Sequence, residues 1–422
     1  MTITAAPSTA SAGMWQPMRH PHFRRFFFAA IVSNAGSWMQ SIAVPFTVYE
    51  ITNSKSWLGI SAFVGLFVGT MANTPGGMLA DRYSRRLVLT CTQLLQMTSA
   101  LLLWALWTFG HPSIASMMPL LILGAIGGGL TMPVWQSFFP SLVPSHEVSA
   151  AIRLNSMQFA VARSVGPVLG AITLKVFGPS VCFMVNAVTY PVIIAAVALV
   201  PEPSRAAMAD RAPLRFSQVI ADVADGWRYL RTTAGLRYAP MAVFVNAAFG
   251  FGLTTLAPAL ARDQFHHKAN DNGTLVGGFG IGGVIGVVAV GMLARRSSNA
   301  RQLRSAFVAW TAASVGLAIT HSFWIGFVAF AAAGLANSVG GTALNTSVQM
   351  QTEDQYRGRV MGIYMQMFFL GSALGSLGLG VLADVASLQV AAGLSAVAFM
   401  AFHVWSMLRF DGLRVLDAPI KP

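Results

Sequence analysis

The feature that most constrains the fold of this chain is a series of long apolar stretches that recurs along the whole sequence. A helix needs about 20 mostly apolar residues to cross roughly 30 Å of hydrocarbon. With 55% hydrophobic and only 10% charged residues among 422, the chain has more apolar surface than a water-soluble core can bury. We therefore expect an all-α polytopic membrane protein. Twelve transmembrane helices are predicted, at residues 26–49, 57–80, 87–109, 117–139, 151–177, 182–200, 238–260, 274–293, 305–320, 323–349, 360–383 and 388–408.

The twelve stretches form two sets of six, separated by a polar segment at residues 201–237. This segment holds three prolines and six arginines, and none of its apolar runs is long enough to cross a bilayer. We expect it to be a cytoplasmic linker between an N-terminal six-helix half at 26–200 and a C-terminal six-helix half at 238–408. Residues 1–25 and 409–422 are expected to be cytoplasmic tails.

Basic residues are distributed unequally between the two sides of the expected membrane. Short loops rich in Lys and Arg stay in the cytoplasm. With the N-terminus inside, the outer loops carry only Lys55, Lys175, Arg262 and Lys268, and nearly all other basic residues fall inside. Both termini are therefore predicted to be cytoplasmic. An amphipathic stretch of the linker near residues 216–230 is expected to lie along the membrane surface.

Several classes of function are disfavoured. The net charge of +13 is spread over all the inner loops, so we do not expect nucleic acid as a partner. The sequence has no phosphate-binding loop of the form G-x-x-x-x-G-K-[ST], and its eight histidines show no metal-ligand spacing. Cys91 and Cys182 fall in apolar spans and are expected to be buried thiols without a disulfide. We predict no catalytic residues, no metal and no cofactor.

The most informative motif is the run GGMLADRYSRR, between the second and third predicted spans. Charges are expensive inside a bilayer, so this cluster must lie at a membrane surface. Its spacing, G-x-x-x-D-R-x-x-R-R, is similar to the loop between helices 2 and 3 of the major facilitator superfamily of secondary transporters, with Ser84 where glycine is usual. The alternative is a basic turn that only sets topology. The resemblance implies a conformational latch made of Gly77, Asp81, Arg82, Arg85 and Arg86.

The resemblance to the superfamily implies a mechanical role for Asp81. A carboxylate at a helix end pairs with a helix dipole or an arginine when the cytoplasmic side is closed, and releases it when that side opens. Gly77 lets a neighbouring helix approach closely. The run G-M-L-A recurs at Gly291, followed by Arg295 and Arg296 where an acid would be expected. Paired halves of this kind build a central site that opens alternately to each side.

Arg163 lies near the middle of the predicted span at 151–177. A mid-membrane arginine costs about 2.5 to 3.5 kcal/mol on insertion scales, so it must face a partner or a watery cavity. We predict that it lines the translocation path. The alternative is a structural arginine bonded to helix carbonyls or to Asn155 or Gln158.

Stripes of small residues on two predicted spans favour close helix packing. In the span at 151–177 the stripe includes Gly166 and Gly170, and Pro167 is expected to bend or loosen the helix. Two such stripes can pack backbone to backbone. The element G-P-x-x-G also resembles a motif of drug-proton exporters in the superfamily, where it is associated with outward transport. The second stripe is Gly278, Gly282 and Gly286.

Amides and tryptophans within the predicted spans are further candidates for substrate contacts. Each has a structural alternative, because buried amides commonly bond across helices in a membrane. Together with Arg163, the predicted translocation path includes Asn34, Trp38, Gln40, Gln136, Asn155, Gln158 and Gln366. Other candidates are Gln93, Gln96, Trp135, Asn246, Asn345 and Gln349.

Three segments resemble one branch of the superfamily, that of siderophore exporters and transmembrane secretion proteins. They are SNAGSWMQSIAVPFTVYEIT in the first span, LVPSHEVSAAIRLNSMQFAVARSVGPVLGA around the fifth, and QTEDQYRGRVMGIYMQ at the start of the eleventh. The resemblance implies a transporter of the bacterial inner membrane that exports a small, bulky, often aromatic molecule, with siderophores as the leading substrate class. Efflux of antibiotics such as macrolides is the alternative; an importer or a transport-dead sensor is less favoured.

The expected partners are a small-molecule substrate, membrane lipid and protons as the coupling ion, and the protein is expected to be a monomer. Many proton-driven exporters use a buried carboxylate. Here the acidic residues fall at helix ends, in loops or in tails. A proton relay would therefore have to involve Asp81, Glu50, a histidine such as His403, or a charge on the substrate itself.

Overall fold

The computed structural model describes residues 13–200, 216–233, 236–293, 297–353 and 355–409. Over these residues the predicted all-α fold of twelve membrane helices in two halves is confirmed. Among the described helices, nine are long and apolar enough to cross a membrane, and a bent pair makes a tenth. The helices α1 and α13 complete the twelve.

The helix bounds agree with the predicted spans to within a few residues. The first half comprises α1 (Pro21–Thr52), α2 (Lys55–Arg82), α3 (Arg85–Phe109), α4 (Ile114–Phe138), α5 (Val148–Phe177) and α6 (Pro179–Ala198). The linker contributes α8 (Phe216–Thr232). The second half comprises α9 (Ala239–Val245), η4 (Asn246–Phe251), α10 (Gly252–Thr255), α11 (Ala257–Ala259), η5 (Leu260–Gln264), α12 (Asn272–Leu293), α13 (Asn299–Ile319), α14 (Phe323–Met350), α15 (Arg357–Val385) and α16 (Leu388–Arg409).

Local sequence signals explain the tight connection between α1 and α2. Asn53 ends α1 in the left-handed conformation (φ 50°), which Asn tolerates better than most residues. The next residue, Ser54, is the N-cap of α2, and its side chain accepts a hydrogen bond from the Trp57 backbone N–H. The chain therefore reverses within two residues.

The seventh predicted span is broken, unlike its counterpart α1. It consists of α9, the π-helix η4, α10, α11 and the π-helix η5, and the two parts are bent by 45° at Leu256. Pro258 stands just after the bend and cannot donate a backbone hydrogen bond. Extra residues in π-helical turns are often found at functional positions.

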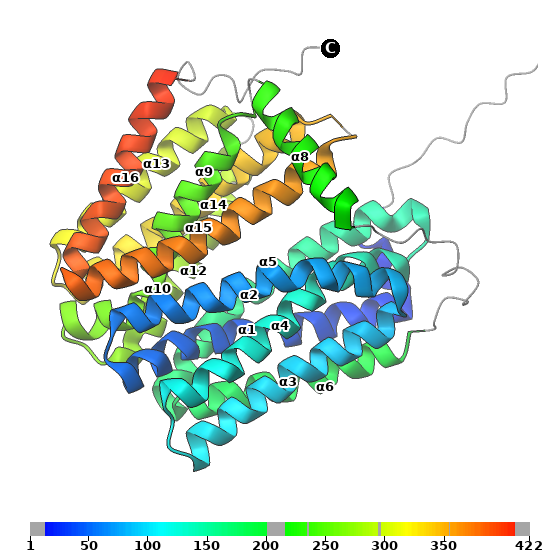
Figure 1. Ribbon diagram of the computed structural model, residues 1–422, viewed down its shortest axis with the longest axis horizontal. Helices are drawn as coiled ribbons and strands as arrows, with labels where there is room; N and C mark the ends of the chain where they lie inside the picture. Colours follow the sequence, from blue (N-terminus) through cyan, green and yellow to red (C-terminus); the bar gives the residue numbers. More distant parts are fainter. Residues whose placement is uncertain (1–12, 201–215, 234–235, 294–296, 354, 410–422) are drawn as a thin grey trace, which may run out of the picture.

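The two halves lie side by side (Figure 1), with α2 packed on α15 and α5 on α12. We call the end of the molecule where α1 begins, α16 ends and α8 lies the linker end. The opposite end, which holds the α1–α2 connection and η5, is called the hairpin end. In Figure 1 the ribbons of the two halves approach each other at the hairpin end and diverge toward α8.

The amphipathic stretch of the linker forms α8, which packs on the first turns of α15. Tyr229 stacks on Tyr356 with ring centroids 4.2 Å apart, and Asp225 forms an ion pair of 2.8 Å with Arg359. Gly226 lies against Arg359 and Ile363 of the same helix. The described part of the linker is thus attached to the second half.

The two cysteines differ in exposure. Cys182 is buried, as expected, but Cys91 is exposed, so the expectation of two buried thiols is wrong for it. The helix that carries Cys91, α3, packs on α4 and α6, and its remaining side is left uncovered.

Candidate functional site

Arg163 lies half-way along α5 and is exposed, although its helix spans the membrane. Successive residues of a helix are 100° apart, so Arg163 points away from Val165 and Ile172, which are exposed apolar residues suited to lipid. On one side of Arg163, Gly166 packs on α1; on the other, Ala171 packs on Gly273 of the second half. The guanidinium therefore points between the two halves.

Arg163 makes no hydrogen bond or ion pair with any group that the structure describes. The two amides that were its alternative partners are engaged elsewhere. Gln158 accepts a hydrogen bond from Asn34 (3.1 Å) and donates to Asn155 (3.2 Å), and Asn155 also accepts from Trp135 Nε1 (3.2 Å). The structural alternative for Arg163 therefore finds no support in Asn155 or Gln158.

The predicted path residues occupy different surroundings. Asn34, Asn155 and Gln158 form one chain of amides between α1 and α5, and Gln158 is fully buried. Gln40 accepts from Asn186 of α6 (2.7 Å). The hydrogen bonds of these amides lie within the first half. Contact of the amides with substrate stays a prediction. The exposed members of the set are Arg163, Gln136 and Gln366, and Trp38 is half-buried.

The other amides and tryptophans are also divided between packing and exposure. Trp135 is buried against Phe26, with ring centroids 4.8 Å apart. Gln96 donates to Thr131, and Gln349 donates to Asn345 (2.5 Å). Gln93 is buried, and Asn246 is half-buried in the π-helix η4. Asn186, which sequence reasoning missed, is a buried polar residue of α6.

The two glycine stripes pack, but not against each other. A Cβ on Gly166 or Gly170 would collide with α1, and the buried Pro167 lies between these two positions within the continuous helix α5. The stripes therefore do not pair with each other, because each has a partner in its own half. Gly278, Gly282 and Gly286 of α12 pack on Phe327, Ala331 and Leu335 of α14.

The loop between α2 and α3 is held to the first half by its arginines. Arg85 donates to the Ser137 carbonyl oxygen at the end of α4 (3.0 Å), and Arg86 donates to the Val200 carbonyl oxygen (3.3 Å). Arg82 is exposed. The side chain of Asp81 and residues Arg295 and Arg296 lie outside the described part of the chain. A Cβ on Gly77 would meet no described atom within 4 Å, so this position has room for a neighbour.

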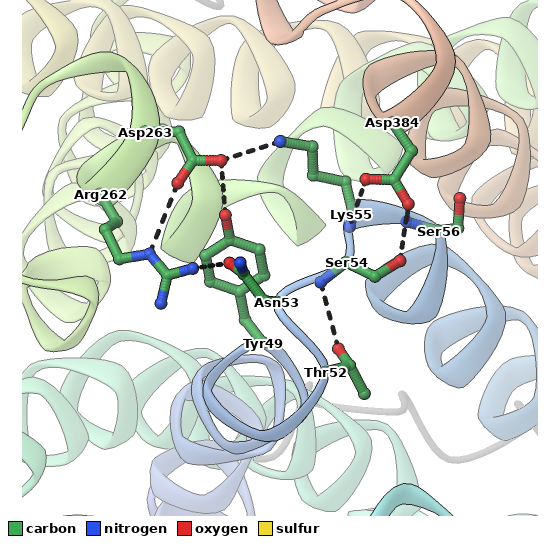
Figure 2. Close-up of polar contacts among 9 residues, drawn as sticks. All are labelled: Tyr49, Thr52, Asn53, Ser54, Lys55, Ser56, Arg262, Asp263 and Asp384. Carbon is green, nitrogen blue, oxygen red and sulfur yellow. Dashed lines mark hydrogen bonds and ion pairs between the residues drawn. The ribbon is translucent and has the colours of Figure 1, made fainter.

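At the hairpin end, Asp263 of η5 joins the second half to the first (Figure 2). Its Oδ2 accepts a hydrogen bond from the Tyr49 hydroxyl (2.5 Å) and lies 2.8 Å from Lys55 Nζ. Arg262 pairs with Asp263 at 3.4 Å, donates to Asn53 and lies over the Tyr49 ring. Residues of α1, the α1–α2 turn and α2 thus contact Asp263 or the adjacent Arg262.

Asp384, near the end of α15, binds the start of α2. Its carboxylate accepts hydrogen bonds from the backbone N–H groups of Lys55 and Ser56 (2.9 Å each) and from the Ser54 hydroxyl (2.6 Å). The first N–H groups of a helix have no partner within the helix and carry partial positive charge. Asp384 therefore compensates the α2 N-terminus from the other half of the molecule.

Asp271 completes the set of hairpin-end carboxylates, which we define as Asp263, Asp271 and Asp384. It accepts a hydrogen bond from Lys175 at the end of α5 (2.8 Å) and lies 3.4 Å from His267. Burial alone would raise the pKa of Asp271, but the hydrogen bond and charge of Lys175 lower it below its usual value, with a smaller effect of His267. Each hairpin-end carboxylate belongs to the second half and binds a positive group of the first.

Sequence reasoning did not pair these residues. It placed Lys55, Lys175 and Arg262 in outer loops only as topology signals. One signal in the sequence could have indicated these pairs. The outer loops carry nearly equal numbers of acidic and basic residues, whereas the inner loops are mainly basic. Among described residues, the hydrogen bonds and ion pairs found between the halves all lie at the hairpin end, on the groups named above and from Asn272 to the Ile42 carbonyl oxygen.

The family comparison agrees with this architecture. Residues 12–418 match the family described as transmembrane secretion effector, one of the major facilitator superfamily. The chain belongs to this family of transporters. Its fold and family are those of transporters and not of enzymes, and they place the chain in a membrane with a small molecule as its substrate.

Curated relatives of the transporter cover most of its length. It is 23% identical over 365 residues to the staphyloferrin A transporter of Staphylococcus aureus, covering 83% of this chain and 88% of that protein. It is 25% identical over 410 residues to the enterobactin exporter EntS of Shigella boydii serotype 18, covering 94% and 93%.

Solved structures share the fold. A bacterial homologue of the human lysosomal transporter Spinster, in an inward-facing and unoccupied conformation, superimposes with a TM-score of 0.70 at 15% identity, covering 95% of this chain and 99% of that one. The nucleoside transporter NupG gives a TM-score of 0.70 at 11% identity, covering 92% and 99%.

Proposed function

We propose that this transporter exports a small organic anion of the siderophore class from the bacterial cytoplasm by alternating access. The observation that carries the proposal is Arg163, which is exposed, mid-membrane and without a partner among the described groups. An unpaired guanidinium at this depth favours a watery surrounding and an anionic ligand. The relatives named for staphyloferrin A and enterobactin support the same substrate class.

The arrangement of the two halves suits the loading step of an exporter. The described contacts between the halves close the hairpin end, and the positive-inside distribution of basic residues favours a cytoplasmic linker end. In that orientation, with both termini in the cytoplasm of an inner-membrane protein, the path to Arg163 leads from the cytoplasm. We infer that the described conformation is the one that receives substrate.

The loop between α2 and α3 has its role in the opposite conformation. Closing the linker end would bring another helix to Gly77, where a Cβ now meets open space. Asp81 would then latch the closed end, with Arg82, Arg85 and Arg86 holding the loop in place. This latch follows the resemblance of the motif and is part of the proposal.

Energy is proposed to come from the proton-motive force. Among described residues, the carboxylates lie at helix ends or in α8, away from Arg163. Glu50 is exposed at the end of α1, and His403 in α16 is half-buried, with no partner for its Nδ1 among the described groups. The proton carrier is therefore proposed to be one of these groups, Asp81 or the substrate. A monomer suffices for every step, since both halves are in one chain.

The proposed function is tested by secretion of a catecholate siderophore under iron starvation, in a host that lacks its own exporter. The wild-type chain should restore secretion, and Arg163→Ala should lower it at least tenfold. Arg163→Lys should retain part of the activity, because it keeps the charge but loses the planar fork that matches carboxylates. Arg153→Ala, which removes an exposed arginine of the same helix, is the matched control.

Two outcomes would overturn parts of the proposal. Secretion by Arg163→Ala at the wild-type rate would remove Arg163 from the path. Failure of the wild-type chain to restore secretion, with the protein present in the membrane, would reject the siderophore and make antibiotic efflux the function to test next.

A further inference from the structure

A five-residue pattern, G-x-L-A-D, closes both α2 and α15. It reads Gly77 to Asp81 in α2 and Gly380 to Asp384 in α15, and in both helices it stands in the last two turns. The two helices pack against each other and run in opposite directions, since α2 begins at the hairpin end and α15 ends there. Each aspartate is therefore carried toward the N-terminus of the other helix.

At the hairpin end this pairing is formed. Asp384 accepts the first two N–H groups of α2, from Lys55 and Ser56. Gly380 makes the close approach possible, because a Cβ there would lie 2.7 Å from the Lys55 carbonyl oxygen and 2.9 Å from the Gly59 Cα. Gly59 in turn meets the α15 backbone at Ser376. The carboxylate and the glycines thus hold the two helices backbone to backbone.

At the linker end the same helices have room between them. A Cβ added to Gly77 of α2 would meet no described atom within 4 Å, and the same holds for Gly358 and Gly362 of α15. Tyr356, the N-cap of α15, makes no capping hydrogen bond with its side chain. Among the described residues, no carboxylate of the first half is bonded to the start of α15 as Asp384 is bonded to the start of α2.

We propose that Asp384 is a positioning residue of the transport cycle, which holds the hairpin end shut by capping α2 and must release it before that end opens. Asp384 acts through the helix and touches no substrate. It is the hairpin-end counterpart of Asp81, and the two carboxylates engage in alternation. The proposal rests on the alternating access proposed above.

The difference between Asp384 and its neighbour Glu50 supports an active role. Both are acids at the hairpin end, but Glu50 is exposed and has no hydrogen bond or ion pair with any described group. Asp384 makes three hydrogen bonds, all to the other half. The charged side chain of Asp384 thus makes hydrogen bonds that must break if the two halves are to separate at the hairpin end. Glu50 provides a matched control for its removal.

The test measures which side of the membrane reaches the space beside Arg163. In a Cys91→Ser, Cys182→Ala background, Ala160→Cys places a thiol on the exposed side of α5. An impermeant maleimide is applied to right-side-out and to inverted vesicles. Wild-type protein should label mainly from the linker side. Asp384→Ala should raise labelling from the hairpin side by roughly 5- to 30-fold, the effect of losing one or two good contacts.

The controls separate the bond from the charge and from damage to the fold. Glu50→Ala should label like wild type. Asp384→Asn should fall between wild type and Asp384→Ala, because its amide oxygen still accepts a hydrogen bond but carries no charge. Asp81→Ala should lower labelling from the hairpin side, the opposite direction. Labelling of Asp384→Ala that matches Glu50→Ala would overturn the proposal.

A second measurement keeps the proposal testable if Asp384→Ala folds poorly. Ser54→Cys with Asp384→Cys, joined by a reducible bifunctional thiol reagent, ties the same two helix ends covalently. In the protein without Ala160→Cys, the cross-link should abolish transport, and reduction should restore it. Undiminished transport with the cross-link intact would overturn the proposal.

Failure of this proposal is distinguishable from failure of the proposed function, because labelling needs no substrate. If Asp384→Ala changes labelling but the wild-type chain secretes no siderophore, the proposed substrate is rejected and the positioning role of Asp384 stands. Secretion without an effect of Asp384 would reject the positioning role alone.

Discussion

The two ends of this transporter differ in how charge is arranged between the halves. At the hairpin end, carboxylates of the second half meet positive groups of the first, as Asp271 meets Lys175 (2.8 Å). At the linker end, exposed arginines stand on both halves, among them Arg82 of the first and Arg357 of the second. Opposite charges attract at such a distance. The hairpin end is therefore held together by its charges, whereas no ion pair between the halves is found at the linker end among the described residues.

This difference teaches that a few polar contacts set which end is open. A ligand or mutation shifts such an equilibrium only by as much as it favours one state over the other. Contacts that exist at one end alone are the ones that qualify. The packing inside each half, such as the amide chain of Asn34 and Gln158, is expected to be the same in both states and to contribute little to the choice.

The largest expected effect comes from filling the open glycine at the linker end. Gly77→Leu should leave the described conformation unchanged, since no described atom lies within 4 Å of a Cβ there, but it should obstruct closure at that end. We expect near-complete loss of transport with an unchanged melting temperature. Gly380→Leu, the matched change at the hairpin end, would clash with the Lys55 backbone and should open that end to labelling. Wild-type transport by Gly77→Leu would contradict the comparison.

A smaller effect is expected from reversing the charge of Asp263. Asp263→Lys places a third cation beside Lys55 and Arg262, where the carboxylate is now 2.8 Å from Lys55 Nζ. Like charges at this distance repel, so labelling from the hairpin side should rise more than tenfold. The swap Lys55→Asp with Asp263→Lys restores opposite charges and should return labelling to within about threefold of wild type. A swap no better than the single variants would show that the charges do not act as a pair.

The smallest effect is expected at the Lys175–Asp271 pair, because the Lys175 side chain is 60% exposed. Exposed pairs contribute about 0.2 to 1 kcal/mol, so Lys175→Ala should raise labelling from the hairpin side by at most about fivefold, and less at high salt.

The same pair predicts how closure depends on pH. A lowered carboxyl pKa stabilises the paired state above the usual value of about 4 and loses that effect as pH falls through the lowered pKa. Because the pKa of Asp271 is lowered, its contribution should be constant between about pH 5 and 8. Opening of the hairpin end between pH 8 and 6 would contradict the assignment.

The number and bounds of the helices could be predicted because the bilayer imposes a length. Each predicted span corresponds to a described helix, and α1 extends beyond its prediction because Pro21 suits a first helical turn and Asn53 suits the end. The break in the seventh span was not predicted. Its backbone partners change from α-helical to π-helical at Asn246, which a hydropathy pattern does not report.

The candidate site was predicted unevenly. Arg163 stands out in sequence because charge is costly in lipid, and the structure leaves it exposed. The amides were indistinguishable in sequence, since a buried amide serves packing or substrate equally well. Only contacts separate the bonded Gln158 from the exposed Gln136 and Gln366. The helices that pack on the glycine stripes could likewise not be predicted, because any helix able to approach closely could pack there.

The sequence by itself therefore determined those features that depend on the free energy of single residues in lipid or in water. They are the twelve membrane helices, the charged loop after α2 and the energetically costly arginine in α5. What the tertiary structure decided is which distant groups meet. The bond from Asp384 to Ser54 joins residues 330 positions apart, so the local pattern around Asp384 does not show which helix N-terminus it meets. It forms because two antiparallel helices of different halves bring a carboxylate to a helix N-terminus, where unpaired N–H groups attract it.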